Sequence, residues 1–342
     1  MNKSEKIKLS VVDQSPIRKE SKPSEALKES VKLAQFTENM GFKRYWVSEH
    51  HNSNSFSGTS PEILIGQIAA ATKEIRIGSA GVMLSHYSPL KIAEEFKMLD
   101  AFYPGRIDLG IGRAPGTDKI TNQALNYPKG IINVHNEFPQ MVKDLIGFTS
   151  NTLDENHQFN QINVLPGIPE ETYPEIWLLG SSDYSARLAA NLGLPFSFAD
   201  FFGYTNNVGP NIAKIYREEF KPSEFLLKPK LNVTLQVICA ESEEHARHVS
   251  SSRNFNKIVS TMGLKTYGFI KPEDASNWIL NQNIQNQVEY FTQGYIDGNP
   301  EQVKQKIIEA SNNYETYDIG IVSNCYYFSD RKKSYELIAN LF

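Results

Sequence analysis

The stretch IKLSVV (Ile7–Val12) begins the pattern that decides the fold. It alternates apolar and polar residues, which is typical of a β-strand. A helix then opens at Pro23 and ends at Gly41, with Leu27 and Val31 on its apolar face. These residues therefore predict one strand-then-helix unit.

The same unit recurs along the chain. Further strands are expected at residues 45–47, 75–78, 106–112, 175–179, 195–199, 231–240 and 318–322. Helices are expected near residues 60–71, 88–99, 134–146, 183–192, 209–220, 243–255, 300–312 and 331–341. Eight strands that alternate with helices favour an α/β fold of the (β/α)8 TIM barrel type, with a doubly wound parallel sheet as the main alternative.

Two stretches interrupt this alternation of strands and helices. Residues 150–172 lack periodicity and are expected to form an excursion loop or a small hairpin after the fourth helix. Residues 260–297 are polar and rich in Asn and Gln, which indicates an insertion between strands seven and eight. It would act as a lid over the barrel mouth or as a contact surface. Because no stretch has the composition of a linker, residues 1–342 are expected to form a single domain.

Composition and charge restrict the class of protein. The chain has 342 residues, 40% hydrophobic and 22% charged, which suits a large globular barrel. A formal net charge of -4 without a basic cluster argues against nucleic-acid and membrane partners. The two distant cysteines, Cys239 and Cys325, indicate neither a disulfide framework nor a zinc site. No apolar run reaches the ~18 residues of a membrane span, so a cytoplasmic protein is expected.

Two adjacent histidines follow the second strand, at the end of a barrel strand where active sites lie. Because side chains alternate along a strand, His50 should share a face with Trp46, whereas His51 should not. Only one histidine is therefore expected to face the barrel mouth, and no metal site is predicted. Two structural histidines that only make hydrogen bonds are the alternative.

Small residues mark the ends of the third and fourth strands. Residues 78–82 (GSAGV) would let the backbone approach a flat ligand closely. Gly110 and Gly112 share the inward face of the fourth strand, which predicts a space that a ligand fills, with tight packing as the alternative. Residues 110–116 superficially resemble a dinucleotide fingerprint, but their GxGxxxG spacing and Pro115 argue against one.

A candidate anion site follows the fourth and fifth strands. Arg113 carries a permanently charged guanidinium group that suits phosphate. Residues 180–187 (GSSDYSAR) open a helix whose hydroxyl and backbone N–H groups favour an anion. If the two strands are neighbours, both features would act on one phosphate. An ordinary serine N-cap is the alternative.

Five motifs resemble those of a known family. They are LSVVDQSP (9–16), WVSEHH (46–51), GSAGVML (78–84), PGRIDLGIGRAPGTD (104–118) and WLLGSS (177–182). The chain resembles the bacterial luciferase-like, flavin-dependent monooxygenases, most closely their alkanal monooxygenase-like subgroup. The resemblance covers nearly the whole chain and is weaker across residues 260–297. It implies a (β/α)8 barrel that uses reduced FMN and O2 and forms a homodimer.

The resemblance also implies roles for individual residues. His50 matches the active-site histidine beside the flavin. Ala80 and Gly81 match paired small residues, joined by a non-proline cis peptide, on which the isoalloxazine ring rests. The other residues at positions that match the cofactor site are Gly112, Arg113, Gly180, Ser181, Ser182, Tyr184 and Ser185. Gly112 stands where luciferase has a reactive cysteine, which argues against light emission and against luciferase's aldehyde specificity.

The expected function is oxygenation of a small organic substrate through a flavin C4a-hydroperoxide, with His50 handling a proton or a hydrogen bond. No nicotinamide-binding fingerprint is visible in the sequence, so a separate flavin reductase is expected to supply reduced FMN. Two alternatives remain: deazaflavin-dependent hydride transfer, which occurs in the same superfamily, and flavin binding without turnover.

Overall fold

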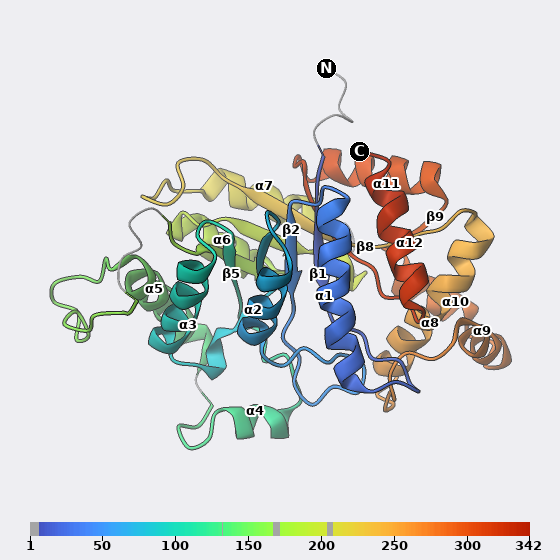
Figure 1. Cartoon of the computed structure of the whole chain (residues 1–342), viewed down its shortest axis with the longest axis horizontal. Coiled ribbons are helices and arrows are strands. Elements are labelled where there is room, and N and C mark those ends of the chain that lie inside the picture. The colour runs from blue at the N-terminus through green and yellow to red at the C-terminus, as the bar shows by residue number, and fades with distance from the viewer. Residues whose placement is uncertain (1–6, 132, 167–171, 204–207) are drawn as a thin grey trace.

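The computed structural model describes residues 7–131, 133–166, 172–203 and 208–342, and within them eight parallel strands form a closed barrel (Figure 1). The barrel strands are β1 (Lys8–Asp13), β2 (Arg44–Val47), β3 (Arg76–Ser79), β5 (Ile107–Gly112), β6 (Glu175–Gly180), β7 (Phe196–Ala199), β8 (Leu231–Cys239) and β10 (Asp318–Val322). The ring closes because β10 pairs with both β1 and β8. This closure confirms the (β/α)8 barrel and excludes the doubly wound sheet, which has open edges.

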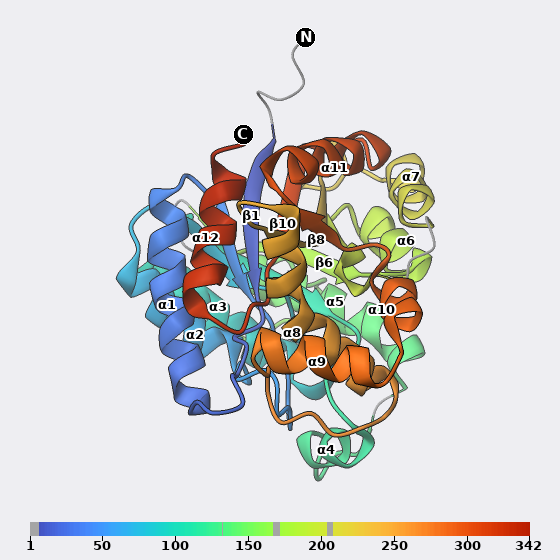
Figure 2. The ribbon, with the colours of Figure 1, turned by 90° about the vertical axis from the view of Figure 1, so that its right-hand side faces the viewer.

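Helices surround the barrel (Figures 1 and 2). They are α1 (Pro23–Asn39), α2 (Pro61–Ala71), α3 (Pro89–Phe102), α5 (Val134–Ser150), α6 (Asp183–Leu192), α7 (Gly209–Glu219), α8 (Glu243–Thr261), α11 (Pro300–Asn313) and α12 (Phe328–Ala339). Several, such as α1, α2 and α3, begin with proline, whose missing N–H costs no hydrogen bond in the first turn. Within the described ranges, no helix is both long and apolar enough to cross a bilayer.

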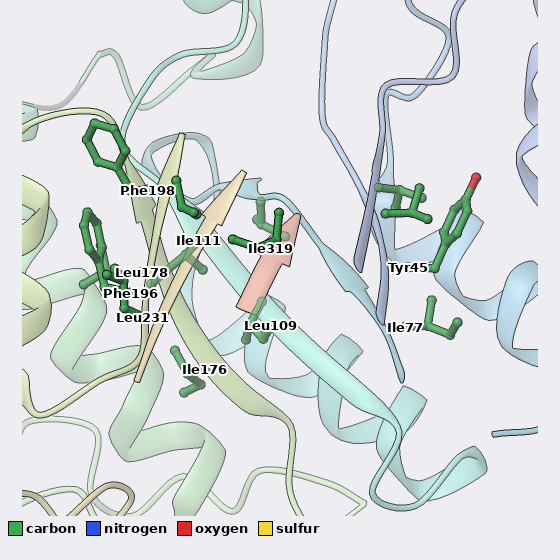
Figure 3. Close-up of a cluster of buried hydrophobic side chains, with 14 of the residues drawn as sticks. Tyr45, Ile77, Leu109, Ile111, Ile176, Leu178, Phe196, Phe198, Leu231 and Ile319 are labelled. Atoms are coloured by element: carbon green, nitrogen blue, oxygen red, sulfur yellow. The ribbon is translucent and has the colours of Figure 1, made fainter. Parts of the chain in front are cut away.

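The hydrophobic core lies between the barrel and its helices (Figure 3). As predicted for the fourth strand, Ile107, Leu109 and Ile111 of β5 are fully buried in this outer cluster. Phe96 of α3 and Phe138 of α5 belong to the same cluster. The alternating residues of β5 therefore face the inside of the barrel.

Large and charged side chains fill the N-terminal half of the barrel interior. Trp46 of β2 and Trp177 of β6 meet edge to face, with ring centroids 5.2 Å apart. The Trp46 indole donates a 2.9 Å hydrogen bond to Asp108 of β5, which is also paired with Arg76. The barrel is therefore a packed core and not a pore.

The first interrupting stretch is a loop. Residues 151–166 form turns without a strand, and residues 167–171 of the predicted excursion lie outside the described residues. The sequence did not predict α4 (Lys119–Leu125), which stands beyond the C-terminal end of the barrel (Figure 1). Asp118 caps this short helix by accepting hydrogen bonds from two backbone N–H groups at 3.0 Å.

The second stretch, residues 260–297, contains more regular structure than its polar sequence indicates. It holds α9 (Pro272–Asn281), α10 (Gln285–Thr292) and β9 (Ile296–Gly298), and α9 lies against α8 in Figure 2. Three of its buried apolar side chains, Ile279, Ile284 and Val288, form a cluster with Ile258 of α8. Phe269, Ala275 and Ile296 are buried as well.

Candidate active site

A cavity of about 320 Å³ opens at the C-terminal ends of the barrel strands. Residues within or just after five strands line it: Gln14, His50, Phe201, Gln236 and Asn324. Other wall residues come from α8 and the segment after it: Arg253, Lys257, Thr266, Phe269 and Tyr295. Among the described residues, His50 is the one sequence-predicted site residue in this wall.

A second cavity, of about 390 Å³, lies at the opposite end of the barrel. Its three cations, Arg44, Arg76 and Lys230, are each paired with an acidic side chain. The N-terminal face of such barrels serves stability, whereas the C-terminal face carries the chemistry. We therefore place the candidate active site at the C-terminal cavity, although it is the smaller of the two.

His50 lines the cavity as a neutral imidazole. Its Nδ1 lies 3.1 Å from the Ser48 hydroxyl oxygen, and its ring centroid lies 4.8 Å from that of Phe56. Burial lowers the pKa of His50 to about 4; Glu49 opposes this shift and His51 adds to it. At neutral pH His50 can exchange hydrogen bonds with a bound group but is rarely protonated.

Glu49 and His51 belong to a separate hydrogen-bond network and do not line the cavity. The Oε1 atom of Glu49 accepts a 2.8 Å hydrogen bond from the Tyr87 hydroxyl and lies 2.6 Å from His51 Nε2. The Met83 backbone N–H donates to the other carboxylate oxygen at 2.9 Å. The two histidines thus lie in different environments, as the strand alternation predicts, and Glu49 fixes the chain just beyond Gly81.

An apolar platform lies at the barrel mouth, formed by Ala80, Leu179 and Phe201. These side chains pack against the cluster that contains Trp46 and Trp177. The Ala80–Gly81 peptide bond is cis, as the resemblance implies.

The open space predicted beside Gly110 is absent. A Cβ atom there would clash with the Ser79 carbonyl oxygen and would lie 2.7 Å from Leu179 Cδ1. Tight packing, the alternative interpretation, is therefore correct for Gly110. At Gly112 a Cβ atom would lie 3.5 Å from the Met83 sulfur, which is an ordinary contact.

The residues of the predicted anion site meet where β5 and β6 end side by side. The two strands pair directly, with Ile111 opposite Leu178. The Arg113 guanidinium carbon lies 4.4 Å from the centroid of the Tyr184 ring in the first turn of α6. The structure therefore brings the cation and the helix start together, as the sequence predicts for neighbouring strands.

Hydroxyl groups and one acidic group complete this site. Ser182 is the N-cap of α6, and its side chain makes no capping hydrogen bond. Ser185 is buried against Gly180, where a Cβ atom would clash with the serine hydroxyl. Asp183 accepts a 2.9 Å hydrogen bond from the Tyr184 N–H, which places one negative charge at the helix start. Arg187 of α6 lies 3.7 Å from the Asp183 carboxylate and offsets part of this negative charge.

The sequence did not identify two buried amide side chains in the cavity wall. Gln236 and Asn324 are each 3% exposed. The Nε2 atom of Gln236 and the Oδ1 atom of Asn324 have no hydrogen-bond partner among the described residues. Because buried polar atoms are normally paired, an unpaired donor and acceptor in a cavity wall indicate a ligand. The signal available in the sequence was their position. Gln236 lies in β8, the seventh barrel strand, and Asn324 follows β10, the eighth.

Comparisons with known proteins identify the family and support the fold. Residues 7–314 match the family described as Luciferase-like monooxygenase. The N-acetyl-S-alkylcysteine monooxygenase of Bacillus subtilis (strain 168) is 33% identical over 339 residues, with 98% of each chain covered. The structure of apo-MsnO8 is 33% identical, has a TM-score of 0.88 and covers 98% of each chain. A Pseudomonas putida protein, the oxygenating constituent of 3,6-diketocamphane monooxygenase in complex with FMN, has a TM-score of 0.69 over 97% of each chain, and at 18% identity shows the fold alone.

Proposed function

Because the chain belongs to the luciferase-like monooxygenase family, we propose that it is an FMN-dependent enzyme that uses reduced FMN and O2 to oxygenate a small organic substrate. One observation carries the proposal. Arg113 stacks on Tyr184 at the start of α6, at the same end of the barrel as the His50 cavity, so that a cation and a helix N-terminus adjoin the candidate active site. FMN would require this arrangement, with its phosphate group beside Arg113 and its reactive ring near the His50 cavity.

The residues at the mouth fit the two ends of FMN. Arg113, with the hydroxyl groups of Ser182 and Ser185, would hold the phosphate. The isoalloxazine ring would rest on the apolar platform and on the Ala80–Gly81 segment. The remaining residues assigned to the cofactor site under this proposal are Gly112, Gly180, Ser181 and Tyr184. When bound, FMN would supply the oxygen chemistry, and the protein would orient it and limit access of water. The oxygenating route expected from the sequence is part of this proposal.

Incorporation of labelled oxygen tests the reaction. Anaerobically reduced FMN is mixed with the protein, 18O2 and an N-acetyl-S-alkylcysteine, for which one relative is named. We expect one labelled atom on the substrate sulfur and the other in water, with two electrons from the reduced flavin. Conversion that proceeds without O2 and requires a reduced deazaflavin would instead support the hydride-transfer alternative.

Replacing His50 with alanine is expected to lower the product yield and raise the release of hydrogen peroxide, with FMN affinity nearly unchanged. His50 lines the cavity and is not part of the anion site. Since its pKa is about 4, protonation of His50 should not reduce the yield between about pH 8 and 6. Product and peroxide are measured together, with the exposed His245→Ala as control. An unchanged ratio of product to peroxide would contradict the assignment.

We also propose that a separate flavin reductase supplies reduced FMN and that the protein works in the cytoplasm. Both cysteines, Cys239 and Cys325, are buried free thiols, which suits a reducing compartment. A pull-down from cell extract with the FMN-loaded protein, followed by assay for flavin reduction, tests the first of these.

We propose a homodimer formed through α2 and α3. Their outer face, with the adjacent loop, exposes Ile63, Met98, Phe102 and Leu165 to 66%, 56%, 72% and 62% along one groove. Contiguous apolar surface of this kind marks an interaction site. Phe102→Glu is expected to convert a dimer into a monomer in light scattering. Ile120→Glu, on α4 and 78% exposed, is the control and should leave the dimer intact. A monomeric wild type would exclude this interface.

We propose that residues 260–297, within one domain of residues 1–342, form a lid over the cavity. Thr266, Phe269 and Tyr295 belong to the cavity wall. Hydrogen exchange in this segment should be fast without ligand and slow with FMN and a substrate mimic, because closure excludes water. Amides of α2 serve as the internal reference. Slow exchange in both states would support the contact-surface alternative.

A further inference from the structure

We infer that Gln236 and Asn324 form a subsite of the C-terminal cavity that recognises a secondary amide group, –CO–NH–, of the substrate. The inference rests on the proposed function, since it names the class of substrate that would lie beside His50. The unpaired atoms of the two side chains, their place in the barrel and the apolar residues of the same wall carry it.

The two side chains present one hydrogen-bond donor and one acceptor. The Nε2 atom of Gln236 and the Oδ1 atom of Asn324 have no partner among the described residues. Both residues line the cavity, and each is 3% exposed. A secondary amide carries the complementary groups, because its carbonyl oxygen accepts and its N–H donates. One amide group can therefore satisfy both atoms, whereas an ester or a ketone can satisfy only Gln236.

The side-chain amide of Asn324 is held in one orientation. Its Nδ2 atom donates a 2.6 Å hydrogen bond to the Oε1 atom of Gln14. Strand register explains this contact. The strands β1 and β10 pair in parallel with Val11 opposite Ile321, so Gln14 and Asn324, each three residues further on, also face each other. Because Nδ2 is engaged by Gln14, Oδ1 is the atom that remains for a ligand.

The two amide side chains lie across the barrel from the predicted anion site. The closed ring of strands runs β10, β1, β2, β3, β5, β6, β7, β8, so β10 stands opposite β5 and β1 stands opposite β6. Gln236 belongs to β8 and Asn324 follows β10, whereas Arg113 follows β5. With the phosphate at Arg113 and the flavin ring on the apolar platform, the side of the mouth that holds Gln236, Asn324 and His50 is left for the substrate.

Part of the same wall suits an apolar group attached to the amide. Phe56, Phe201 and Phe269 line the cavity. The ring centroids of Phe56 and Phe269 lie 5.9 Å apart, and the His50 ring lies 4.8 Å from that of Phe56. Aromatic side chains favour the apolar body of a ligand, and a few placed polar groups fix its orientation. The inferred substrate class is therefore an amide with an apolar substituent.

Calorimetry with three matched probes tests the inference. N-benzylacetamide, benzyl acetate and 4-phenylbutan-2-one share an acetyl group and an aromatic ring, and they differ in the NH, O or CH2 group beside the carbonyl. The wild-type protein should bind the amide at least about fivefold more tightly than the ester or the ketone, because neither analogue offers a donor to Oδ1 of Asn324. The titrations are made with and without saturating FMN.

Two variants separate the roles of the two side chains. Asn324→Leu removes the acceptor, so the three probes should bind with similar affinity. Gln236→Met removes the donor to the carbonyl, so all three probes should bind more weakly while the amide keeps its advantage over the ester. Asn340→Leu and Gln305→Met make the same changes at exposed positions outside the cavity wall, and both should match the wild type.

Three results with the probes would overturn the inference: equal affinity for amide and ester in the wild type, binding of no probe, or a preference for the amide that survives in Asn324→Leu. A large loss of FMN affinity in both Asn324→Leu and Gln236→Met would also overturn it, because these side chains would then contact the flavin. The wild-type comparison involves no substitution, so it decides the inference even where a variant fails to fold.

The proposed function fails separately, through the FMN titration and the oxygen-labelling experiment on the wild type. Preference for the amide without FMN binding would overturn the proposed function alone. FMN binding without preference for the amide would overturn the substrate class alone.

Discussion

Replacing Arg113 with alanine is expected to weaken FMN binding at least about tenfold. Arg113 is the cation at the end of β5 and stacks on Tyr184 at the start of α6. Charge-assisted hydrogen bonds to a phosphate contribute roughly 1.5 to 3 kcal/mol each, and the guanidinium group offers two in parallel. Arg113→Lys should recover part of the affinity, because it keeps the charge but loses the planar fork. Isothermal titration calorimetry measures both variants.

A surface arginine away from the anion site provides the control. Arg247 of α8 is paired with Glu243 on the protein surface, so Arg247→Ala should leave FMN affinity close to that of the wild type. Riboflavin, which lacks the phosphate, should bind to Arg113→Ala and to the wild type with similar affinity. Equal FMN affinity in Arg113→Ala and the wild type would show that the phosphate lies elsewhere.

Replacing Arg331 with methionine is expected to reduce the free energy of unfolding by about 3 to 5 kcal/mol. Arg331 of α12 contacts Asp13, at the end of β1, at 2.6 Å, and the two side chains are 2% and 0% exposed. Tyr45 donates a further hydrogen bond to Asp13 at 2.6 Å. Removing the arginine would leave a buried carboxylate without its counter-charge.

Urea denaturation measures this loss of unfolding free energy, and an ion pair on the protein surface provides the comparison. Arg247→Met breaks an ion pair with Glu243 whose side chains are 77% and 56% exposed, and it should cost less than about 1 kcal/mol. The double variant Asp13→Leu, Arg331→Met should recover much of the stability, because no buried charge remains unpaired. A cost for Arg331→Met as small as that of Arg247→Met would contradict the role of the buried pair.

The same pair predicts how stability depends on pH. Burial would raise the pKa of Asp13, but Arg331 and the hydrogen bonds of Ser30 and Tyr45 hold it below its usual value of 3.8. A carboxyl group with a lowered folded-state pKa contributes stability that is fully present above its unfolded pKa. That contribution is lost as the pH falls through the folded-state pKa. Denaturation by acid should therefore be less steep in the double variant than in the wild type.

The fold follows from the sequence where one face of each element is buried. The alternation of Ile107, Leu109 and Ile111 identified a strand, and proline at the first turn marked several helices. Helices α9 and α10 were not predicted, because their few buried side chains, such as Ala275, Ile279 and Val288, stand in a stretch rich in Asn and Gln. Helix α4 depends on local capping by Asp118 and has no fully buried residue to give a pattern.

Some features of the candidate site could likewise be predicted from the sequence, whereas others depend on the folded structure. Strand order sufficed to place Arg113 beside the start of α6, since consecutive barrel strands are neighbours. The packing at Gly110 depends on Ser79 and Leu179, which only the folded backbone brings close. The lowered pKa of His50 arises from burial, which a motif does not encode. Lys257 enters the cavity because α8 passes beside the barrel mouth.

Parallel calorimetric titrations of the wild-type protein with FMN and with riboflavin test the central claim most directly. The two ligands share the ring system and differ in the phosphate, which is the group assigned to Arg113 and the start of α6. We predict that FMN binds at least about tenfold more tightly than riboflavin. Equal affinities for the two flavins would contradict the assignment of the anion site and, with it, the proposed placement of FMN.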